Sequence, residues 1–220
     1  MGTTLETSFK TPAPGHLAGR AILITGAGDG LGRATALACA RHGAQVILLG
    51  KTVKKLEAVY DAIEAAGGPT PAIYPLNLAG ASWKDYGELA ATIERELGRL
   101  DGIVHCAAFF KHFQALDEIS PQEWVESLQV NLTGAYALTR QCLPLLQAAP
   151  DASVVFITDA PGRKPKPYAG AYGVSKAAME NLSAMWAQEL ERFPNLRFNT
   201  FNPGPMASGV RLKGYPGDVI

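Results

Sequence analysis

The chain has 220 residues, of which 47% are hydrophobic and 18% charged, and its formal net charge is zero. This length and composition are typical of one globular domain with a substantial hydrophobic core. A chain without net charge has no general electrostatic attraction to nucleic acid or to an anionic membrane, so we expect neither as a partner.

The three cysteines, Cys39, Cys106 and Cys142, are far apart and lie in apolar surroundings. Their number and spacing match neither a disulfide framework nor a metal site, so we expect a cytoplasmic protein without bound metal. No apolar run approaches the ~20 residues of a membrane span. Residues 1–16 are mostly polar and lack a signal-peptide pattern, so we expect a flexible arm before a single domain of residues 17–220.

Short apolar segments alternate with longer helical patterns along the rest of the chain. The strands are expected at Ala21–Thr25, Gln45–Leu49, Ala72–Leu76, Gly102–Ala107, Ser153–Thr158 and Leu196–Phe201. The helices are expected at Leu31–His42, Val53–Ala66, Trp83–Leu97, Ser120–Ala148 and Tyr168–Arg192. This alternation predicts an α/β domain with a doubly wound parallel sheet of Rossmann type, about six strands wide, with helices on both faces.

A glycine-rich segment, Thr25-Gly26-Ala27-Gly28-Asp29-Gly30-Leu31-Gly32, joins the first strand to the first helix. Such a turn directs backbone N–H groups and the positive end of the helix dipole toward an anion. Glycines also allow a pyrophosphate to approach the backbone closely. A plain glycine-rich turn is the alternative, but the position between strand and helix favours dinucleotide binding, although the spacing differs from G-x-G-x-x-G.

Tyr172 and Lys176 are four residues apart in a predicted helix, so their side chains share one face. A free tyrosine has a pKa near ~10 and is a poor general base at neutral pH, whereas a nearby lysine favours the phenolate. An isolated pair with this spacing is more often part of an ordinary amphipathic helix. The pair therefore gains meaning only from the other motifs.

The chain resembles the short-chain dehydrogenase/reductases, whose cofactor loop reads T-G-x-x-x-G-x-G. The resemblance extends from about Leu17 to Ser208 and follows the family's order of motifs. The matching segments after the glycine loop are Leu100–Ala108, Val130-Asn131-Leu132, the pair Tyr172 and Lys176, and Asn202-Pro203-Gly204.

The resemblance implies an oxidoreductase that transfers hydride between NADP(H) or NAD(H) and a small carbonyl or alcohol substrate. By this resemblance Tyr172 would exchange a proton with the substrate oxygen, and Lys176 would bind the nicotinamide ribose and lower the pKa of Tyr172. Asn131 would bend its helix and hold a water molecule. The cofactor contacts implied are Gly26, Asp29, Gly30, Leu31, Gly32, Lys51, Asn77, Leu78, Cys106, Ala107, Ala108, Tyr172, Lys176, Pro203, Gly204, Met206 and Ser208.

The family also implies a homodimer or homotetramer. Family members usually continue through another helix and a seventh strand, so a chain that ends at Ile220 is short for the family. We therefore expect that part of the usual substrate lid and one usual subunit interface are missing.

Asp159 departs from the family pattern, because it stands thirteen residues before Tyr172, where the family has a catalytic serine. An ionised aspartate cannot donate a hydrogen bond to the substrate oxygen, and its charge would raise the pKa of Tyr172. A protonated Asp159 could donate instead, as could Thr158 if the strand end were shifted. The alternative function is a nucleotide-binding protein with little or no turnover, acting as a sensor or partner subunit.

Cys106 is a second departure, since the family has an asparagine there; we expect a buried structural thiol rather than a redox nucleophile. The second strand ends without the acidic residue that would bind a ribose 2′-hydroxyl. Lys51, with Arg33, could instead meet the 2′-phosphate of NADP(H), which we therefore expect in preference to NAD(H). Asp29 counts against this choice, because many NADP-using relatives carry a basic residue there.

The substrate pocket is expected to be apolar or aromatic, and its predicted lining is Phe109, Phe110, Phe113, Tyr168 and Met206. The basic loop that contains Arg163, Lys164 and Lys166 could attract an acidic group. A solvated loop is the simpler interpretation of these charges.

Overall fold

The computed structural model describes residues 12–206 and 208–217. Most of the arm predicted at residues 1–16 therefore lies outside the described residues. The six strands form one parallel sheet in the order β3-β2-β1-β4-β5-β6. This is the doubly wound arrangement of two βαβαβ halves, and the predicted fold class is confirmed.

The sheet contains the six predicted strands, and the helices include two short ones that were not predicted. The strands are β1 (Ala21–Thr25), β2 (Gln45–Gly50), β3 (Ala72–Pro75), β4 (Gly102–His105), β5 (Ala152–Ile157) and β6 (Leu196–Phe201). The helices are α1 (Gly30–Arg41), α2 (Val53–Ala65), α3 (Trp83–Leu97), α4 (Pro121–Leu128), α5 (Gly134–Ala148), α6 (Ala160–Arg163), α7 (Gly170–Glu189) and α8 (Gly209–Gly214), with a 3₁₀ turn, η1 (Leu116–Glu118), and a π-helical segment, η2 (Gln129–Thr133).

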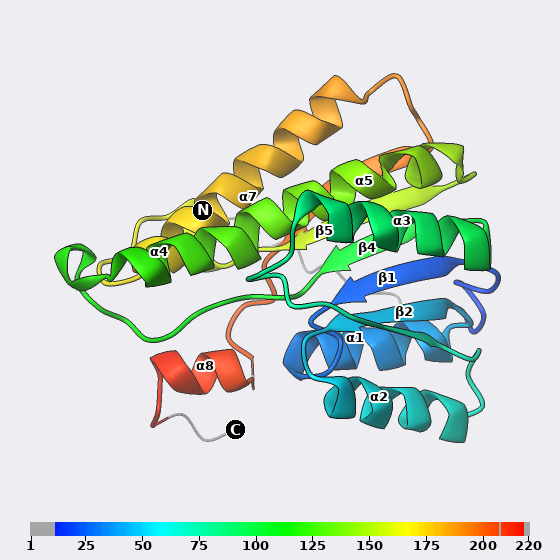
Figure 1. Ribbon diagram of the computed structural model, residues 1–220, viewed down its shortest axis with the longest axis horizontal. Helices are drawn as coiled ribbons and strands as arrows, with labels where there is room; N and C mark the ends of the chain where they lie inside the picture. Colours follow the sequence, from blue (N-terminus) through cyan, green and yellow to red (C-terminus); the bar gives the residue numbers. More distant parts are fainter. Residues whose placement is uncertain (1–11, 207, 218–220) are drawn as a thin grey trace, which may run out of the picture.

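Helices cover both faces of the sheet, with α1 and α2 on one side and α3, α5 and α7 on the other (Figure 1). The packing of the central strand β1 explains why its first four residues are apolar. Leu23 packs into the core beneath α3 and α5, whereas Ile22 and Ile24 pack against α1 and α2. Alternate residues of a strand point to opposite faces, so a strand buried on both faces needs no polar positions.

The carboxyl ends of the parallel strands meet at one edge of the sheet, on the side where α8 lies (Figure 1). The strand order reverses between β1 and β4, and there Thr25 is in register with Leu49 of β2 and His105 of β4. In open α/β sheets, ligands bind in the crevice outside such a reversal. A ligand site is therefore expected at the loops that follow β1 and β4.

Two predicted helices and one predicted loop differ in the structure. The helix predicted at Ser120–Ala148 is divided by the π-helical segment η2, in which Asn131 lies. The helix predicted from Tyr168 begins at Gly170, because Tyr168 has a φ of 68° in the left-handed region. The loop predicted after β5 contains α6, which is too short to produce a helical period in the sequence.

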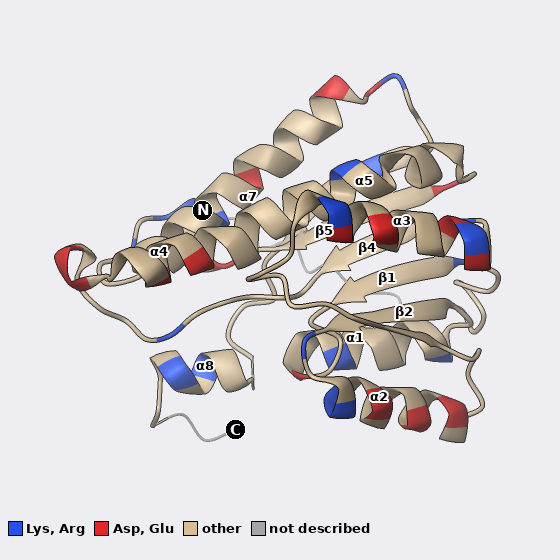
Figure 2. Ribbon diagram, viewed as in Figure 1, with Lys and Arg blue, Asp and Glu red and all other residues tan. Residues whose placement is uncertain are grey.

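The Lys, Arg, Asp and Glu positions fall mostly on helices and loops, while the strands of the sheet carry very few (Figure 2). Within residues 12–206 and 208–217, no helix combines the length and the apolar character that crossing a membrane requires. The same residues include no cluster of three or more His, Cys, Asp and Glu side chains that could hold a metal ion.

Candidate active site

An open cleft of ≈ 790 Å³ lies at the carboxyl edge of the sheet. Ligand sites in proteins commonly have volumes of roughly 300–1,000 Å³, so the cleft has room for a cofactor and part of a substrate. Every residue predicted to contact the cofactor lines this cleft: Gly26, Asp29, Gly30, Leu31, Gly32, Lys51, Asn77, Leu78, Cys106, Ala107, Ala108, Tyr172, Lys176, Pro203, Gly204, Met206 and Ser208.

Glycines shape the end of the cleft that follows β1. Gly26 has a φ of +66°, and a Cβ there would lie 2.9 Å from the Cα of Ala107. A Cβ on Gly32 would lie 2.2 Å from the carbonyl oxygen of Gly26. Only glycine fits either position, and the bare backbone leaves a cradle at the N-terminus of α1 that suits a pyrophosphate.

Two lysines near the end of β2 line the cleft, and the sequence predicted only one of them as a cofactor contact. Lys51 lines the cleft as predicted, and so does Lys55 in the first turn of α2, whereas Arg33 does not. Lys55 Nζ donates to Asp29 Oδ2 at 2.5 Å, and the N–H of Gly30 donates to Asp29 Oδ1 at 2.8 Å. These bonds, that of Lys55 first, lower the pKa of Asp29. A lysine in the first helical turn after a cofactor-binding strand was the signal that could have revealed Lys55.

Asp159 and Tyr172 are brought together at the opposite end of the cleft. Asp159 follows β5 and begins α6, where its Oδ1 accepts the N–H of Ala160 at 2.7 Å. Its Oδ2 accepts the hydroxyl of Tyr172 at 2.9 Å. The neighbouring Thr158 is buried, and its hydroxyl forms no regular hydrogen bond with the described residues. Asp159 rather than Thr158 therefore contacts Tyr172.

The pKa of Tyr172 is raised, first by burial and then by the charge of Asp159 and the hydrogen bond to it. The sequence predicted the opposite effect from Lys176, whose Nζ lies 5.5 Å from the centre of the Tyr172 ring. Lys176 Nζ instead donates to the carbonyl of Ile157 at 2.7 Å, and burial lowers its own pKa to about 8. The protonated phenol is thus strongly favoured in this arrangement.

Asn131, predicted as a catalytic residue, is buried and does not line the cleft. Its Oδ1 accepts the N–H of Phe109 at 2.6 Å, and its Nδ2 donates to the Phe109 carbonyl at 3.0 Å and to Ser175 Oγ at 2.9 Å. Ser175, which the sequence reasoning missed, donates to the carbonyl of Tyr172 at 2.7 Å. Asn131 thereby connects η2 with the loop after β4 and with α7. Its part in a proton relay stays a prediction.

The residues at the end of β4 have structural contacts. Burial raises the pKa of Cys106 to about 12, so the thiol is protonated at neutral pH, as expected of an inert structural cysteine. Burial disfavours the charged form of His105 as well, and therefore lowers its pKa to about 3. The His105 ring stacks on Phe156 with 4.9 Å between centres, and its Nε2 lies 2.8 Å from Thr139 Oγ1.

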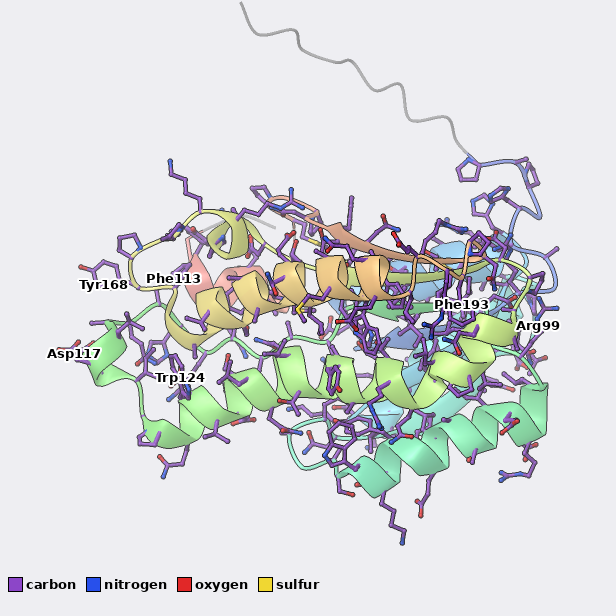
Figure 3. The ribbon with its side chains drawn as sticks, turned by 90° about the horizontal axis from the view of Figure 1, so that it is seen from above. Arg99, Phe113, Asp117, Trp124, Tyr168 and Phe193 are labelled. Atoms are coloured by element: carbon purple, nitrogen blue, oxygen red, sulfur yellow. The ribbon has the colours of Figure 1, made fainter. Side chains whose placement is uncertain are left out.

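Aromatic rings continue the cleft beyond Tyr172. The Phe110 ring lies 5.0 Å from that of Tyr172 and 5.1 Å from that of Phe113, measured between centres. Tyr215, which the sequence reasoning missed, lies 5.4 Å from Phe113. Figure 3 labels Phe113 near the faint red ribbon of α8. Tyr168, predicted to line the pocket, is 62% exposed and lies outside the cleft.

The basic loop divides into three different environments. Arg163 Nε donates to Glu180 Oε1 at 2.9 Å, and Lys164 is exposed and does not line the cleft. Lys166 does line it, together with Lys213 from α8. The interpretation of a merely solvated loop therefore holds for Lys164 only.

Known proteins that are similar to this chain are short-chain dehydrogenases and oxidoreductases. A family model described as short chain dehydrogenase matches residues 20–214. The uncharacterized oxidoreductase YciK of Escherichia coli K12 is 36% identical over 197 residues, which cover 90% of this chain and 77% of YciK; several other curated relatives are covered over 58% of their length.

Solved structures agree with this match in both sequence and shape. A short chain dehydrogenase from Pseudomonas syringae is 43% identical with a TM-score of 0.93, covering 95% of this chain and 85% of that one. A short chain dehydrogenase from Shigella flexneri 2a, in complex with NADP, is 35% identical with a TM-score of 0.89, covering 92% and 84%. The chain belongs to the short-chain dehydrogenase/reductase family of NAD(P)-dependent oxidoreductases.

Proposed function

We propose that the protein interconverts a carbonyl compound and an alcohol with NADP(H), and that Tyr172 is the acid and base of this reaction. The observation that carries the proposal is the position of the Tyr172 hydroxyl and the Lys176 ammonium. Both line one cleft with the glycine loop that suits a pyrophosphate. The nicotinamide, when bound, supplies or accepts the hydride.

Tyr172 and Lys176 have different roles in the proton transfer. In reduction the Tyr172 hydroxyl donates a proton to the carbonyl oxygen, and in oxidation the phenolate takes it from the alcohol. The buried Lys176 ammonium favours negative charge on the phenol oxygen, which is the form left after donation. Lys176 is fixed by its bond to the Ile157 carbonyl at 2.7 Å, so it does not need to reorganise during the reaction.

The Asp159 carboxylate works against the reduction. It accepts a hydrogen bond from the Tyr172 hydroxyl at 2.9 Å, and this bond must break before Tyr172 can donate to a substrate. A neutral hydrogen-bond donor at this position would remove the competition and could bind the carbonyl oxygen. We therefore infer that the charge of Asp159 slows the reduction.

The preference for NADP(H) rests on Lys51 and Lys55 at the end of β2. Two ammonium groups there can meet a 2′-phosphate, whereas no acidic side chain follows β2 to bind a free 2′-hydroxyl. Asp29, which counted against NADP(H), is bound by Lys55 and by the N–H of Gly30. The NADP bound by the Shigella relative supports the same choice.

Fluorescence titration with NADPH and NADH tests the cofactor, and NADPH oxidation with a panel of aldehydes and ketones tests the reaction. Lys51→Glu should weaken NADPH far more than NADH, while Lys54→Glu, an exposed neighbour that does not line the cleft, should change neither. Equal losses for both cofactors would contradict the NADP(H) assignment.

A sensor or partner subunit with little turnover is the second candidate, and the bond between Tyr172 and Asp159 favours it. Tight NADPH binding without oxidation by any carbonyl compound, at any pH at which the protein is folded, would establish this candidate. The homodimer or homotetramer implied by the family stays a prediction, which size measurement in solution would test.

A further inference from the structure

We propose that the substrate carries an anionic group and that Lys166 and Lys213 bind it at the rim of the cleft. This inference rests on the proposed function, because it names the class of carbonyl compound that enters the same site. The anion could be a carboxylate or a phosphate, and the rest of the substrate would be aromatic or apolar.

The short helix α8 places the rim away from the cofactor cradle. Its N-cap, Ser208, lies beside the glycine loop, since a Cβ on Gly30 would be 3.6 Å from the Cβ of Ser208. Its last residue, Gly214, packs on the aromatic wall, since a Cβ there would be 2.8 Å from the Phe113 ring. The helix therefore runs from the cofactor end of the cleft to the substrate end, and Lys213 belongs to the substrate end.

The two lysines are held by neutral groups. Lys213 Nζ donates to the carbonyl of Phe110 at 3.2 Å. Lys166 Nζ donates to the hydroxyl of Tyr215, and it lies 4.6 Å from the centre of the Phe113 ring and 4.9 Å from that of Tyr215. These contacts position both ammonium groups but do not neutralise them.

Neither ammonium has a carboxylate within ion-pair distance among residues 12–206 and 208–217. An ammonium group has three donors, and each lysine uses one of them in the bonds described. Arg211 stacks on Tyr215, with its guanidinium carbon 3.6 Å from the ring centre. In Figure 2 the ribbon of α8 carries basic residues and no acidic ones.

The acidic residues of the cleft lie elsewhere and would orient an anionic substrate. Asp159 is bound to Tyr172, so its charge repels an anion from the reacting end. Asp29 is paired with Lys55 at the cofactor end. Glu126 on α4 is the other carboxylate that lines the described cleft. An anionic group is therefore favoured at the rim, which directs the carbonyl toward Tyr172.

The aromatic wall indicates the length and character of the substrate. The rings of Phe110 and Phe113 stand in sequence between Tyr172 and Lys166. A flat apolar body of one or two rings fits along them, with the carbonyl at one end and the anion at the other. Aromatic or long apolar aldehydes and ketones with a distal acid group meet these requirements.

Two matched pairs of aldehydes test the proposal: 4-formylbenzoate with its methyl ester, and 4′-formylbiphenyl-4-carboxylate with its methyl ester. We expect kcat/KM with NADPH to be about tenfold higher for at least one acid than for its ester. One charge-assisted hydrogen bond contributes about enough free energy for such a difference. Added salt should reduce this preference, because it screens the acid and not the ester.

Variants assign the preference to the rim. Lys166→Met and Lys213→Met should each reduce the acid-to-ester ratio several-fold. Lys164→Met is the matched control and should keep the full ratio, because Lys164 does not line the cleft. The proposal is overturned if the esters react as well as the acids, or if Lys164→Met lowers the ratio as much as the rim variants do.

Calorimetric binding separates failure of this proposal from failure of the proposed function. The Tyr172→Phe variant loaded with NADP⁺ keeps the rim, so it should bind an acid about tenfold more tightly than its ester even if no aldehyde is reduced. Tight binding of the acid to this variant, with no reduction of any aldehyde by the natural protein, would contradict the proposed reaction and support the rim. Equal binding of acid and ester would refute the rim whatever the turnover.

Discussion

Replacing Asp159 by serine should raise the reductase activity. In the present arrangement Tyr172 donates to Asp159 at 2.9 Å, and that bond must break before the proton reaches a substrate. Hydrogen bonds to charged groups contribute about 1.5–3 kcal/mol in proteins. Removing the charge should therefore lower the pKa of Tyr172, which burial and Asp159 now raise.

The same free energy sets the expected gain in rate. Each 1.4 kcal/mol of barrier is about tenfold in rate, so Asp159→Ser should raise kcat/KM for reduction by about 10- to 100-fold at neutral pH. Serine can also accept the N–H of Ala160, which Asp159 now accepts at 2.7 Å, so the start of α6 should be kept.

A second substitution, assayed by NADPH oxidation, separates the effect of the carboxylate charge from that of side-chain size. Asp159→Asn removes the charge at similar size and should also gain activity at neutral pH. If both variants lose activity to the level of Tyr172→Phe at every pH, the carboxylate is required and the reasoning is refuted.

Gly32→Ala should abolish NADPH binding and destabilise the protein by roughly 1–3 kcal/mol, because the new Cβ would lie 2.2 Å from the Gly26 carbonyl oxygen. Gly87→Ala on α3 is the control and should stabilise it by about 0.5–1 kcal/mol, because nothing lies within 4 Å of the added Cβ; a Gly32→Ala variant with normal NADPH affinity would disprove the cradle. Lys176→Met should raise the free energy of unfolding below pH 8, because the pKa of Lys176 falls from 10.5 to about 8 on folding, which is a cost of roughly 3 kcal/mol. This cost is complete below pH 8, where Lys176 is protonated in both the folded and the unfolded state, and it disappears as the pH rises to 10.5. The gain in unfolding free energy from Lys176→Met, measured with urea, should therefore be smaller at pH 10 than at pH 7. An equal gain at both pH values would contradict the assignment.

The fold was largely predictable because each strand and long helix has its own local signal. Strand β1 is apolar at four of its five positions, with Thr25 at its end, and the structure buries all five. The role of the glycine loop could also be predicted from the sequence, because a Cβ on Gly26 or Gly32 would collide with the backbone. Patterns of this kind depend on neighbouring residues, so the sequence contains them directly.

The parts that were not predicted depend on contacts between distant segments. Lys55 acquires its role from Asp29, which is 26 residues away. Tyr215 and Lys213 belong to the aromatic wall only because the six-residue α8 crosses the cleft, and a helix of that length has no detectable period. No local pattern in the sequence indicates such crossings.

The pKa of Tyr172 could be predicted only in part. Spacing placed Lys176 where it would lower this pKa and Asp159 where its charge would raise it. Burial adds to the effect of Asp159, and together they raise the pKa. The extent of burial depends on the packing of the whole cleft, which no spacing reveals.

Tyr172→Phe tests the central claim most directly, with NADPH affinity and carbonyl reduction measured on the same preparation. The account predicts nearly unchanged NADPH affinity, because the glycine cradle and both lysines after β2 remain. It also predicts a loss of turnover of about 10²- to 10⁴-fold, the usual contribution of a positioned proton donor. A variant that oxidises NADPH at the rate of the natural protein would contradict the account.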